Sequence, residues 1–514
     1  MALARLSRSR GHRRRPRILI CTPEITELPE GMGNAAQYVR AKGGGLGDIS
    51  AALIRYLHED GRFQLHVALP KYEGKFQGAH ALETRELDRL APQLRSKGVH
   101  LIQDSAFSRL TDVYDDDPQH TRIRRAEALQ RYMINHLLDM IRPDVVHCND
   151  WMTGLVPAAA REKGFKSLFT LHNVFTERET PENVDRGGID VRRFFNHLYF
   201  EQFPSDFRRD WKWNQIDFTA TGIHAADLVN TVSKTFLEEI VAGEFEHIIP
   251  ASIRHAIREK YEAGRACAIL NAPSDTVDPA RGTHSVPFDH TDVMDKKAVN
   301  KRAFQEKMGL AVEARTPLFL WPSRLYPQKG PELLLAIAER FVRRHRAQIA
   351  LVASGDRALE RSFAFMAAAS KGAIGWVPFR EDLSELGKAG SDFVLMPSRY
   401  EPCGLPQMEC PRFGTLPVTR LTGGLKDTVT ELDVDADSGN GFVFEPHMPE
   451  ALESAMERAV RWTHLPAKQR QQNISRVMRE SFERFNLARM AREYIEIYES
   501  LISGSPVRPT LSSS

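Results

Sequence analysis

The chain has 514 residues, which is too many for a single hydrophobic core, so its length predicts at least two domains. Hydrophobic residues make up 42% of the sequence and charged residues 27%, and the net charge is only +3, which does not indicate a nucleic-acid-binding protein. No run approaches the ~18 apolar residues of a membrane-spanning helix, so we expect neither a nucleic-acid nor a membrane partner.

The ends of the chain and its cysteines indicate a cytoplasmic protein. The basic stretch at 5–17 lacks the apolar core of a secretory signal, and it favours a disordered tail over residues 1–16, with an organelle transit peptide as the alternative. A second disordered tail is expected at 504–514. The cysteines have no CxxC or metal-ligand spacing, which predicts free thiols in a reducing compartment.

The first half alternates between apolar runs and helix-like segments. Residues 17–25 predict a strand, "GDISAALIRYLHEDG" (47–61) a helix, and 63–70 the next strand. A strand–helix–strand unit of this length indicates a parallel sheet. Further strands are predicted at 143–150, 167–173 and 226–233, and 174–215 is expected to form loops and short helices.

A second alternating series follows residue 300. Strands are predicted at 317–325, 347–356, 372–379, 391–399, 415–424 and 439–446. Helices are predicted at 330–345, 358–370, 381–389, 405–413 and 448–462. The fold class is therefore α/β, with two doubly wound domains at 17–300 and 301–484, followed by a C-terminal helix within 485–503.

Polar residues follow the predicted strands of the first domain, where open parallel sheets bind ligands. Asp150 and Trp151 follow one strand, and His172 and Asn173 end another. A lone histidine at such a place is more often structural, but these neighbours favour a site. "AKGGGLGDIS" (41–50), which contains Lys42, is either a phosphate-binding loop or a plain tight turn.

In the second domain, Arg324 and Lys329 lie between a strand and a helix, where two cations can bind a diphosphate. The alternative is a solvated basic loop. Gly355 lies in the next strand-to-helix turn, where a nucleotide can approach the backbone closely.

"SRYEPCGLPQMECPRFGTLPV" (398–418) is the most informative segment. Glu401 and Glu409 are two helical turns apart, and the Pro and Gly residues between them predict a sharp turn that begins a helix. Two carboxylates suit a ligand with two hydroxyl-bearing rings, such as a sugar nucleotide. The alternative is one glutamate at a helix start and one on the surface. Gly423 and Gly424 precede a further helix and offer backbone amides to phosphate.

Taken together, these motifs resemble the bacterial glycogen and starch synthase family of retaining GT-B glycosyltransferases. The resemblance extends from about residue 17 to 500 and rests on "KGGGLGD", "HCNDW", "FTLHN", "SRLYPQKG", "EPCGL", "GTLPV" and "TGGLKDTV". It implies two Rossmann-like domains that face each other across a deep cleft, an N-terminal domain for an α-1,4-glucan acceptor and a C-terminal domain for a nucleotide-sugar donor. It also implies transfer of glucose from ADP-glucose or UDP-glucose to the non-reducing end with retention of configuration, without a metal or resident cofactor.

The resemblance further implies roles for individual residues. The implied catalytic residues are His172, Arg324, Lys329 and Glu401. The implied donor-binding residues are Lys42, Gly44, Gly355, Cys403, Gly404, Leu405, Glu409, Thr422, Gly423 and Gly424. The implied acceptor-side residues are Asp150, Trp151 and Asn173.

The sequence also departs from the family pattern. Gly43 replaces the usual threonine, Pro406 another, and an insertion occupies 26–41. Glu409 stands where this family commonly has an aromatic residue, in a spacing that other GT-B enzymes use to bind ribose. The alternatives are a retaining GT-B enzyme with another acceptor and a non-catalytic glucan-binding protein.

Overall fold

The structure is a computed structural model that describes residues 14–32, 41, 43–72, 98–107, 113 and 118–505. It forms two compact units, the first containing the chain up to Thr170, Val174–Val229 and the segment from Ile495, and the second containing Leu171–Asn173 and Asn230–Tyr494. The predicted tails lie outside the described residues except for 14–16 and 504–505, as do Lys42 and residues 33–40 of the insertion.

Along the chain, the first compact unit gives way to the second at 229/230. The predicted domain join at 300/301 lies, in sequence, after the last strand of the first sheet and before the first strand of the second. The difference arises because α9 (Lys234–Ala242) packs against α16 (Gly423–Thr428) within the second unit. Packing therefore groups the residues that follow 229 with the second unit.

Among the described residues, the first sheet has seven strands in the order β3-β2-β1-β4-β5-β8-β9, and the pairings from β3 to β5 are parallel. The strands are β1 (Arg17–Cys21), β2 (Gln64–Pro70), β3 (Val99–Ile102), β4 (Val145–Asn149), β5 (Lys166–Leu171), β8 (Leu228–Thr231) and β9 (Ala266–Ala268). The five strands predicted for this half are confirmed, and β3 and β9 are additional. Strand order reverses between β1 and β4, so the carboxyl ends of these two strands are the expected ligand-binding position.

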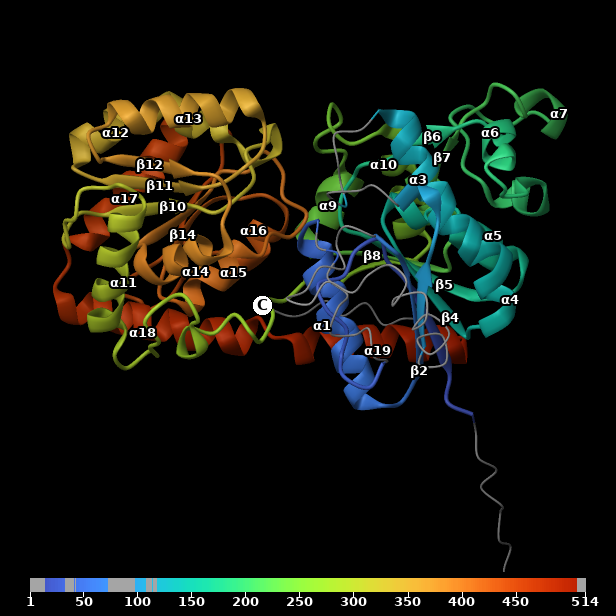
Figure 1. Ribbon diagram of the computed structural model, residues 1–514, viewed down its shortest axis with the longest axis horizontal. Helices are drawn as coiled ribbons and strands as arrows, with labels where there is room; N and C mark the ends of the chain where they lie inside the picture. The colour runs from blue at the N-terminus through green and yellow to red at the C-terminus, as the bar shows by residue number, and fades with distance from the viewer. Residues whose placement is uncertain are drawn as a thin grey trace, which may run out of the picture. The chain divides into compact units, whose positions relative to one another are not determined.

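Helices connect these strands, as the alternating pattern predicted (Figure 1). They are α1 (Gly45–Asp60), α3 (Gln119–Tyr132), α4 (Leu138–Ile141), α5 (Val156–Glu162), α8 (Phe218–Ala225), α9 and α10 (Ala251–Glu262). The predicted α1 ends at Gly61, whose φ of 70° provides the left-handed C-cap. The prediction of short elements over 174–215 is confirmed by β6 (Arg178–Glu179), α6 (Pro181–Arg186), a 3₁₀ turn (Val191–His197) and α7 (Phe207–Asp210), and β7 (Ile216–Asp217) follows them.

The second sheet has six parallel strands in the order β12-β11-β10-β13-β14-β15. They are β10 (Leu318–Trp321), β11 (Gln348–Val352), β12 (Ile374–Val377), β13 (Phe393–Met396), β14 (Leu416–Arg420) and β15 (Phe442–Phe444). All six predicted strands are confirmed. The strand order reverses between β10 and β13, so the loops that follow these two strands flank the switch point.

The second half and the C-terminal region contribute the remaining helices. They are α11 (Val293–Lys307), α12 (Pro331–His345), α13 (Arg357–Ala369), α14 (Glu381–Gly390), α15 (Pro406–Arg412), α16, α17 (Pro449–Thr463), α18 (Ala467–Arg484) and α19 (Leu487–Ser503). All predicted helices of this half are confirmed, including the C-terminal helix. Within the described part of the chain, no helix is long and apolar enough to cross a membrane.

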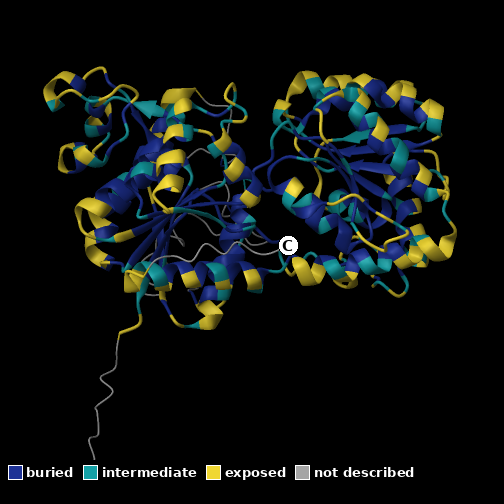
Figure 2. Ribbon diagram, turned by 180° about the vertical axis from the view of Figure 1, so that it is seen from behind, coloured by how far each residue is buried: buried dark blue, intermediate teal, exposed yellow. Residues whose placement is uncertain are grey.

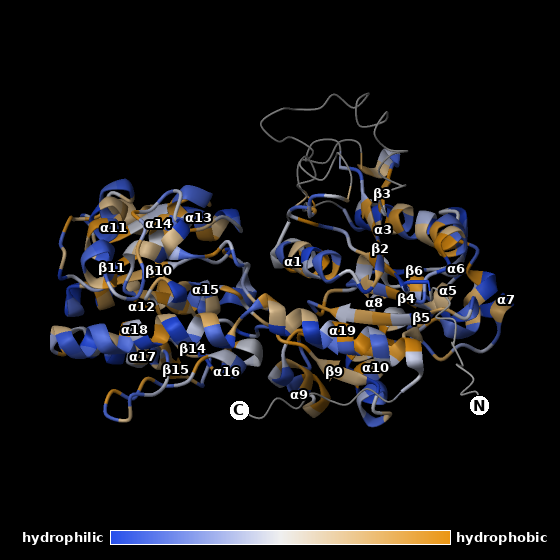
Figure 3. Cartoon of the chain, turned by 90° about the horizontal axis from the view of Figure 1, so that it is seen from below, coloured by the Kyte–Doolittle hydropathy of each residue, from blue (hydrophilic) through white to orange (hydrophobic). Residues whose placement is uncertain are grey.

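The core of the second unit lies on both faces of its sheet, as alternation along the strands requires. Phe319 and Trp321 of β10 belong to a cluster with α12 and α17, while Leu318 and Leu320 belong to another with α11 and α14. Strands are buried and the outer helix faces are exposed in Figure 2. The outer helix α18 is largely hydrophilic in Figure 3 and buries only one face.

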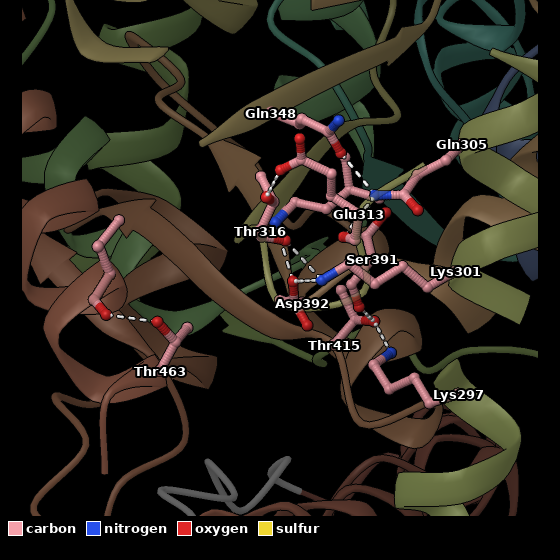
Figure 4. A network of polar contacts seen from close by, with 12 residues as sticks. Lys297, Lys301, Gln305, Glu313, Thr316, Gln348, Ser391, Asp392, Thr415 and Thr463 are labelled. Carbon is pink, nitrogen blue, oxygen red and sulfur yellow. Dashed lines mark hydrogen bonds and ion pairs between the residues drawn. The ribbon is translucent and has the colours of Figure 1, made fainter. Parts of the chain in front are cut away.

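A polar network joins α11 to the residues that precede β13 and β14 (Figure 4). Lys297 Nζ donates to Thr415 Oγ1 at 2.6 Å and to the carbonyls of Phe413 and Ala389 at 3.0 and 3.3 Å. Lys301 Nζ pairs with Asp392 Oδ2 at 2.6 Å. Ala389 is in the last turn of α14, where carbonyls lack partners within their helix, so Lys297 satisfies groups that would otherwise be buried unpaired.

Lys297→Met is expected to lower the free energy of unfolding by about 3 kcal/mol, because it leaves several buried acceptors without a donor. Urea denaturation followed by circular dichroism measures this change. The control is Lys307→Met, an exposed lysine on the same helix, with an expected effect within about 0.5 kcal/mol. Equal effects of the two substitutions would contradict the structural role of Lys297.

Candidate functional site

An ion pair between a buried carboxylate and a partly buried lysine lies at the switch point of the second sheet. Glu401, in the loop after β13, is 3% exposed, and its Oε2 accepts from Lys329 Nζ at 2.6 Å and from Ser398 Oγ at 2.9 Å. Lys329 comes from the loop after β10. Two residues 72 positions apart are thus brought together at the edge where ligands of doubly wound sheets bind.

The close approach of these two loops depends on Gly330. Its φ is 73°, and a Cβ there would lie 2.2 Å from the carbonyl oxygen of Pro397. Any other side chain would therefore push the loops apart. The backbone N–H of Arg399 also donates to the carbonyl of Gln328 at 2.8 Å, so the ion pair rests on a rigid backbone arrangement.

Arg324 lies on the same loop as Lys329 but at its exposed start. Its guanidinium is 5.5 Å from the centre of the Tyr326 ring. Both cations therefore follow β10, as predicted, with Lys329 partly buried against Glu401 and Arg324 accessible to a ligand.

The turn after Glu401 has the predicted sharp geometry. Gly404 has a φ of 76°, Pro406 is the first residue of α15, and Gln407 Nε2 donates to the carbonyls of Cys403 and Gly404 at 3.0 and 3.1 Å. Burial raises the pKa of the Cys403 thiol far above its usual value, so this thiol stays protonated and is a poor nucleophile. Leu405 is the N-cap of α15.

Glu409, the second carboxylate of the predicted pair, forms an ion pair with Lys388 of α14. The two side chains are only 14% and 16% exposed. The role of Glu409 as a ribose ligand stays a prediction, and sequence reasoning did not identify Lys388, which lies 21 residues earlier in another helix.

The glycines expected to bind phosphate have structural partners. A Cβ on Gly355 would lie 2.5 Å from the carbonyl oxygen of Leu325, and its N–H donates to Glu360 Oε1 at 2.8 Å. Gly423 N–H and the Thr422 hydroxyl donate to Glu239 Oε1, and Gly424 N–H donates to the carbonyl of Glu401. Backbone packing and these hydrogen bonds therefore explain why glycine stands at each of these positions. Contact between these glycines and a nucleotide-sugar donor remains a prediction.

Glu239 was missed by the sequence interpretation, although one signal was available. It lies three residues after Phe236 and one before Ile240, which places it on the buried face of α9. A glutamate on an apolar helix face needs a partner, and that requirement could have marked it as structurally important.

The acceptor-side candidates follow β4. Asp150 has a φ of 55° and a ψ of −178°, a conformation that a residue with a side chain rarely adopts. Trp151 begins a 3₁₀ turn, is buried, and lies edge-on to Phe175 with the ring centres 5.5 Å apart. The strained backbone at Asp150 favours a functional role for this turn. Asn173 follows His172 directly after β5 and is partly buried.

His172 is partly accessible to solvent, and the protein atoms around it lower the pKa of its imidazole to about 3 through desolvation. The ring is therefore neutral at physiological pH, able to donate one hydrogen bond and accept another. The resemblance implies that Gly44 binds the nucleotide-sugar donor. In the structure its N–H donates to Glu24 Oε2 at 2.6 Å, and the N–H of Gly43 donates to the same oxygen.

The lowered pKa of His172 predicts a specific pH dependence of stability. Between pH 6.5 and about 3 the unfolded chain binds a proton that the folded chain excludes, so stability is full above pH 6.5 and falls as the pH decreases. From pH 7.5 to pH 5, the free energy of unfolding of the wild type should fall by about 2 kcal/mol more than that of His172→Gln. Urea titrations at both pH values test this, and parallel losses would contradict the desolvated imidazole.

Two family models match the chain. The starch synthase catalytic domain matches residues 17–255, and the glycosyl transferases group 1 model matches residues 305–476. Among the described residues, no group of three or more His, Cys, Asp or Glu side chains could hold a metal ion. The five cysteines are free thiols, as predicted.

Curated relatives match over almost the whole chain. The glycogen synthase of Rhodospirillum rubrum is 31% identical over 505 residues, which cover 92% of this chain and 98% of that protein. The glycogen synthase of Geobacillus thermodenitrificans is 31% identical over 90% of this chain and 95% of that protein. The catalytic domain of starch synthase IV from Arabidopsis thaliana, solved with ADP and acarbose, has the same fold, with a TM-score of 0.77, 24% identity, and coverage of 95% and 99% of the two chains. The chain belongs to the glycogen synthase family of GT-B glycosyltransferases.

Proposed function

We propose that this chain is a glycogen (starch) synthase that transfers glucose from ADP-glucose to the non-reducing end of an α-1,4-glucan, with retention of configuration. The observation that carries this proposal is the ion pair of the buried Glu401 with Lys329 at the switch point of the second sheet. The carboxylate can accept hydrogen bonds from sugar hydroxyls, and the lysine beside it can bind phosphate. A nucleotide sugar carries both hydroxyls and phosphate close together.

Glu401 is proposed to hold the donor glucose. Its contacts with Lys329 and Ser398 both use Oε2, and we assign Oε1 to the glucose hydroxyls. A carboxylate that is already oriented by two donors needs little rearrangement on binding, so its hydrogen bonds act fully in the transition state.

Lys329 and Arg324 are proposed to stabilise the departing nucleoside diphosphate. Negative charge develops on the leaving phosphate as the glycosidic bond breaks, and fixed positive charge at that place lowers the barrier. The incoming glucan hydroxyl attacks the same face, and its proton passes to the departing phosphate oxygen. The protonated thiol of Cys403 takes no covalent role in this scheme.

The neutral imidazole of His172 is proposed to hydrogen-bond the sugar hydroxyls. A neutral ring can donate to one oxygen and accept from another, whereas an imidazolium ion would only donate and would repel the cationic character that develops at the sugar carbon. The reaction uses the nucleotide sugar and the glucan as its two substrates and no resident cofactor, and we place it in the cytoplasm.

The direct test is incorporation of labelled glucose into glycogen from ADP-glucose and, separately, from UDP-glucose. We expect chain extension with both, and kcat/KM at least about tenfold higher with ADP-glucose, equivalent to about 1.4 kcal/mol of transition-state binding. Donor hydrolysis without chain extension would indicate a different acceptor, and binding of glucan without turnover would indicate a non-catalytic protein.

Lys329→Met is expected to lower kcat/KM by about 100-fold, because it removes a phosphate cation and leaves the buried Glu401 carboxylate unpaired. Lys468→Met, at an exposed position of α18, is the matched control and should retain wild-type kinetics. Initial rates at varied ADP-glucose measure both. Unchanged kinetics in the Lys329 variant would contradict the proposed donor site.

A further inference from the structure

Residues 233–239, at and within the start of α9, contact two other segments of the second unit. Ser233 Oγ donates to the carbonyl of Pro402, the residue after Glu401. Thr235 donates to the Asp427 carboxylate through its N–H at 3.0 Å and through its hydroxyl at 2.5 Å. One short stretch of helix thus holds both the Glu401 loop and α16.

Glu239 makes a third, buried contact from α9. Glu239 is the sixth residue of α9 and is 7% exposed, and its Oε1 accepts from Gly423 N–H at 2.9 Å and from Thr422 Oγ1 at 3.1 Å. Burial raises the pKa of this carboxyl group, and the two hydrogen bonds oppose that rise. Removing the side chain would leave buried donors unsatisfied.

The Thr422–Gly424 turn, to which Glu239 is hydrogen-bonded, packs directly against the backbone of Glu401. Gly424 N–H donates to the carbonyl of Glu401 at 3.0 Å. A Cβ on Gly423 would lie 1.9 Å from that same carbonyl oxygen, and one on Gly424 would lie 2.2 Å from the carbonyl oxygen of Cys403. The two segments are in direct backbone contact, so a displacement of the Thr422–Gly424 turn displaces Glu401.

We propose that Glu239 is a positioning residue, which holds the Thr422–Gly424 turn in place and through it sets the position of Glu401 against Lys329. In this assignment the N–H of Gly423 holds the turn to Glu239, and the N–H of Gly424 supports the Glu401 loop. The catalytic consequence rests on the proposed function; the structural consequence does not.

The kinetic test compares three variants with ADP-glucose and glycogen. Glu239→Ala should lower kcat at least tenfold and leave KM for ADP-glucose within about threefold, because it displaces Glu401, whose hydrogen bonds act in the transition state, without removing phosphate charge. Glu239→Gln keeps an oxygen acceptor for Gly423 and Thr422 and should restore kcat to within about threefold of the wild type. Glu238→Ala, an exposed neighbour on α9, should match the wild type.

Hydrogen–deuterium exchange on the full chain gives a second readout that needs no activity. In Glu239→Ala, peptides that cover 401–405 and 421–429 should exchange at least about tenfold faster, with unchanged rates in β10 and β11. Both peptides should remain protected in Glu239→Gln. Uniformly faster exchange would show general unfolding and would overturn the local role.

The outcomes separate the two hypotheses. If the wild type does not extend glycogen, the proposed function fails, and the exchange experiment still decides whether Glu239 supports the Glu401 loop. Wild-type kcat in Glu239→Ala overturns the positioning role. A rise in KM for ADP-glucose with unchanged kcat also overturns it, because that result would place the turn against the donor.

Discussion

The ion pair between Lys329 and Glu401 is the interaction on which the proposed donor site depends. It joins the loops that follow β10 and β13, the two strands where the order of the second sheet reverses. Taking the Glu401 charge, and part of the Lys329 charge, out of water is unfavourable, and it is offset only where geometry is good and further hydrogen bonds are made. The contact at 2.6 Å and the Ser398 hydroxyl meet that condition.

Close backbone approach is the second constraint, and glycine makes it possible. Gly330 lets the Lys329 loop lie against Pro397, and Gly423 and Gly424 let α16 begin against Glu401 and Cys403. A side chain at any of these positions would occupy the space of a carbonyl group. The glycines of "QKG" and "TGG" therefore have a steric explanation that holds without any ligand.

Burial also sets the protonation states around the site. It lowers the pKa of His172 and raises that of the Cys403 thiol, so both side chains are neutral near pH 7. Charge is then concentrated on Arg324, Lys329 and Glu401, which suits a reaction whose main electrostatic change is the departure of a diphosphate. The same effect raises the pKa of Glu239, which is held by backbone and hydroxyl donors instead of by a cation.

The sequence by itself determined the α/β class, both parallel sheets, nearly every strand and helix of the second half, and the loops that carry Lys329 and Glu401. Local periodicity and Gly/Pro signals set these features, because they depend on neighbours within a few residues. Only the tertiary structure decided the partners: Lys388 for Glu409, Glu239 for the Thr422–Gly424 turn, Leu325 for Gly355, and the packing of α9 against α16 that moved the unit boundary to 229/230. These contacts join segments 21 to 192 residues apart, and no local pattern specifies which distant group a buried carboxylate or glycine will meet.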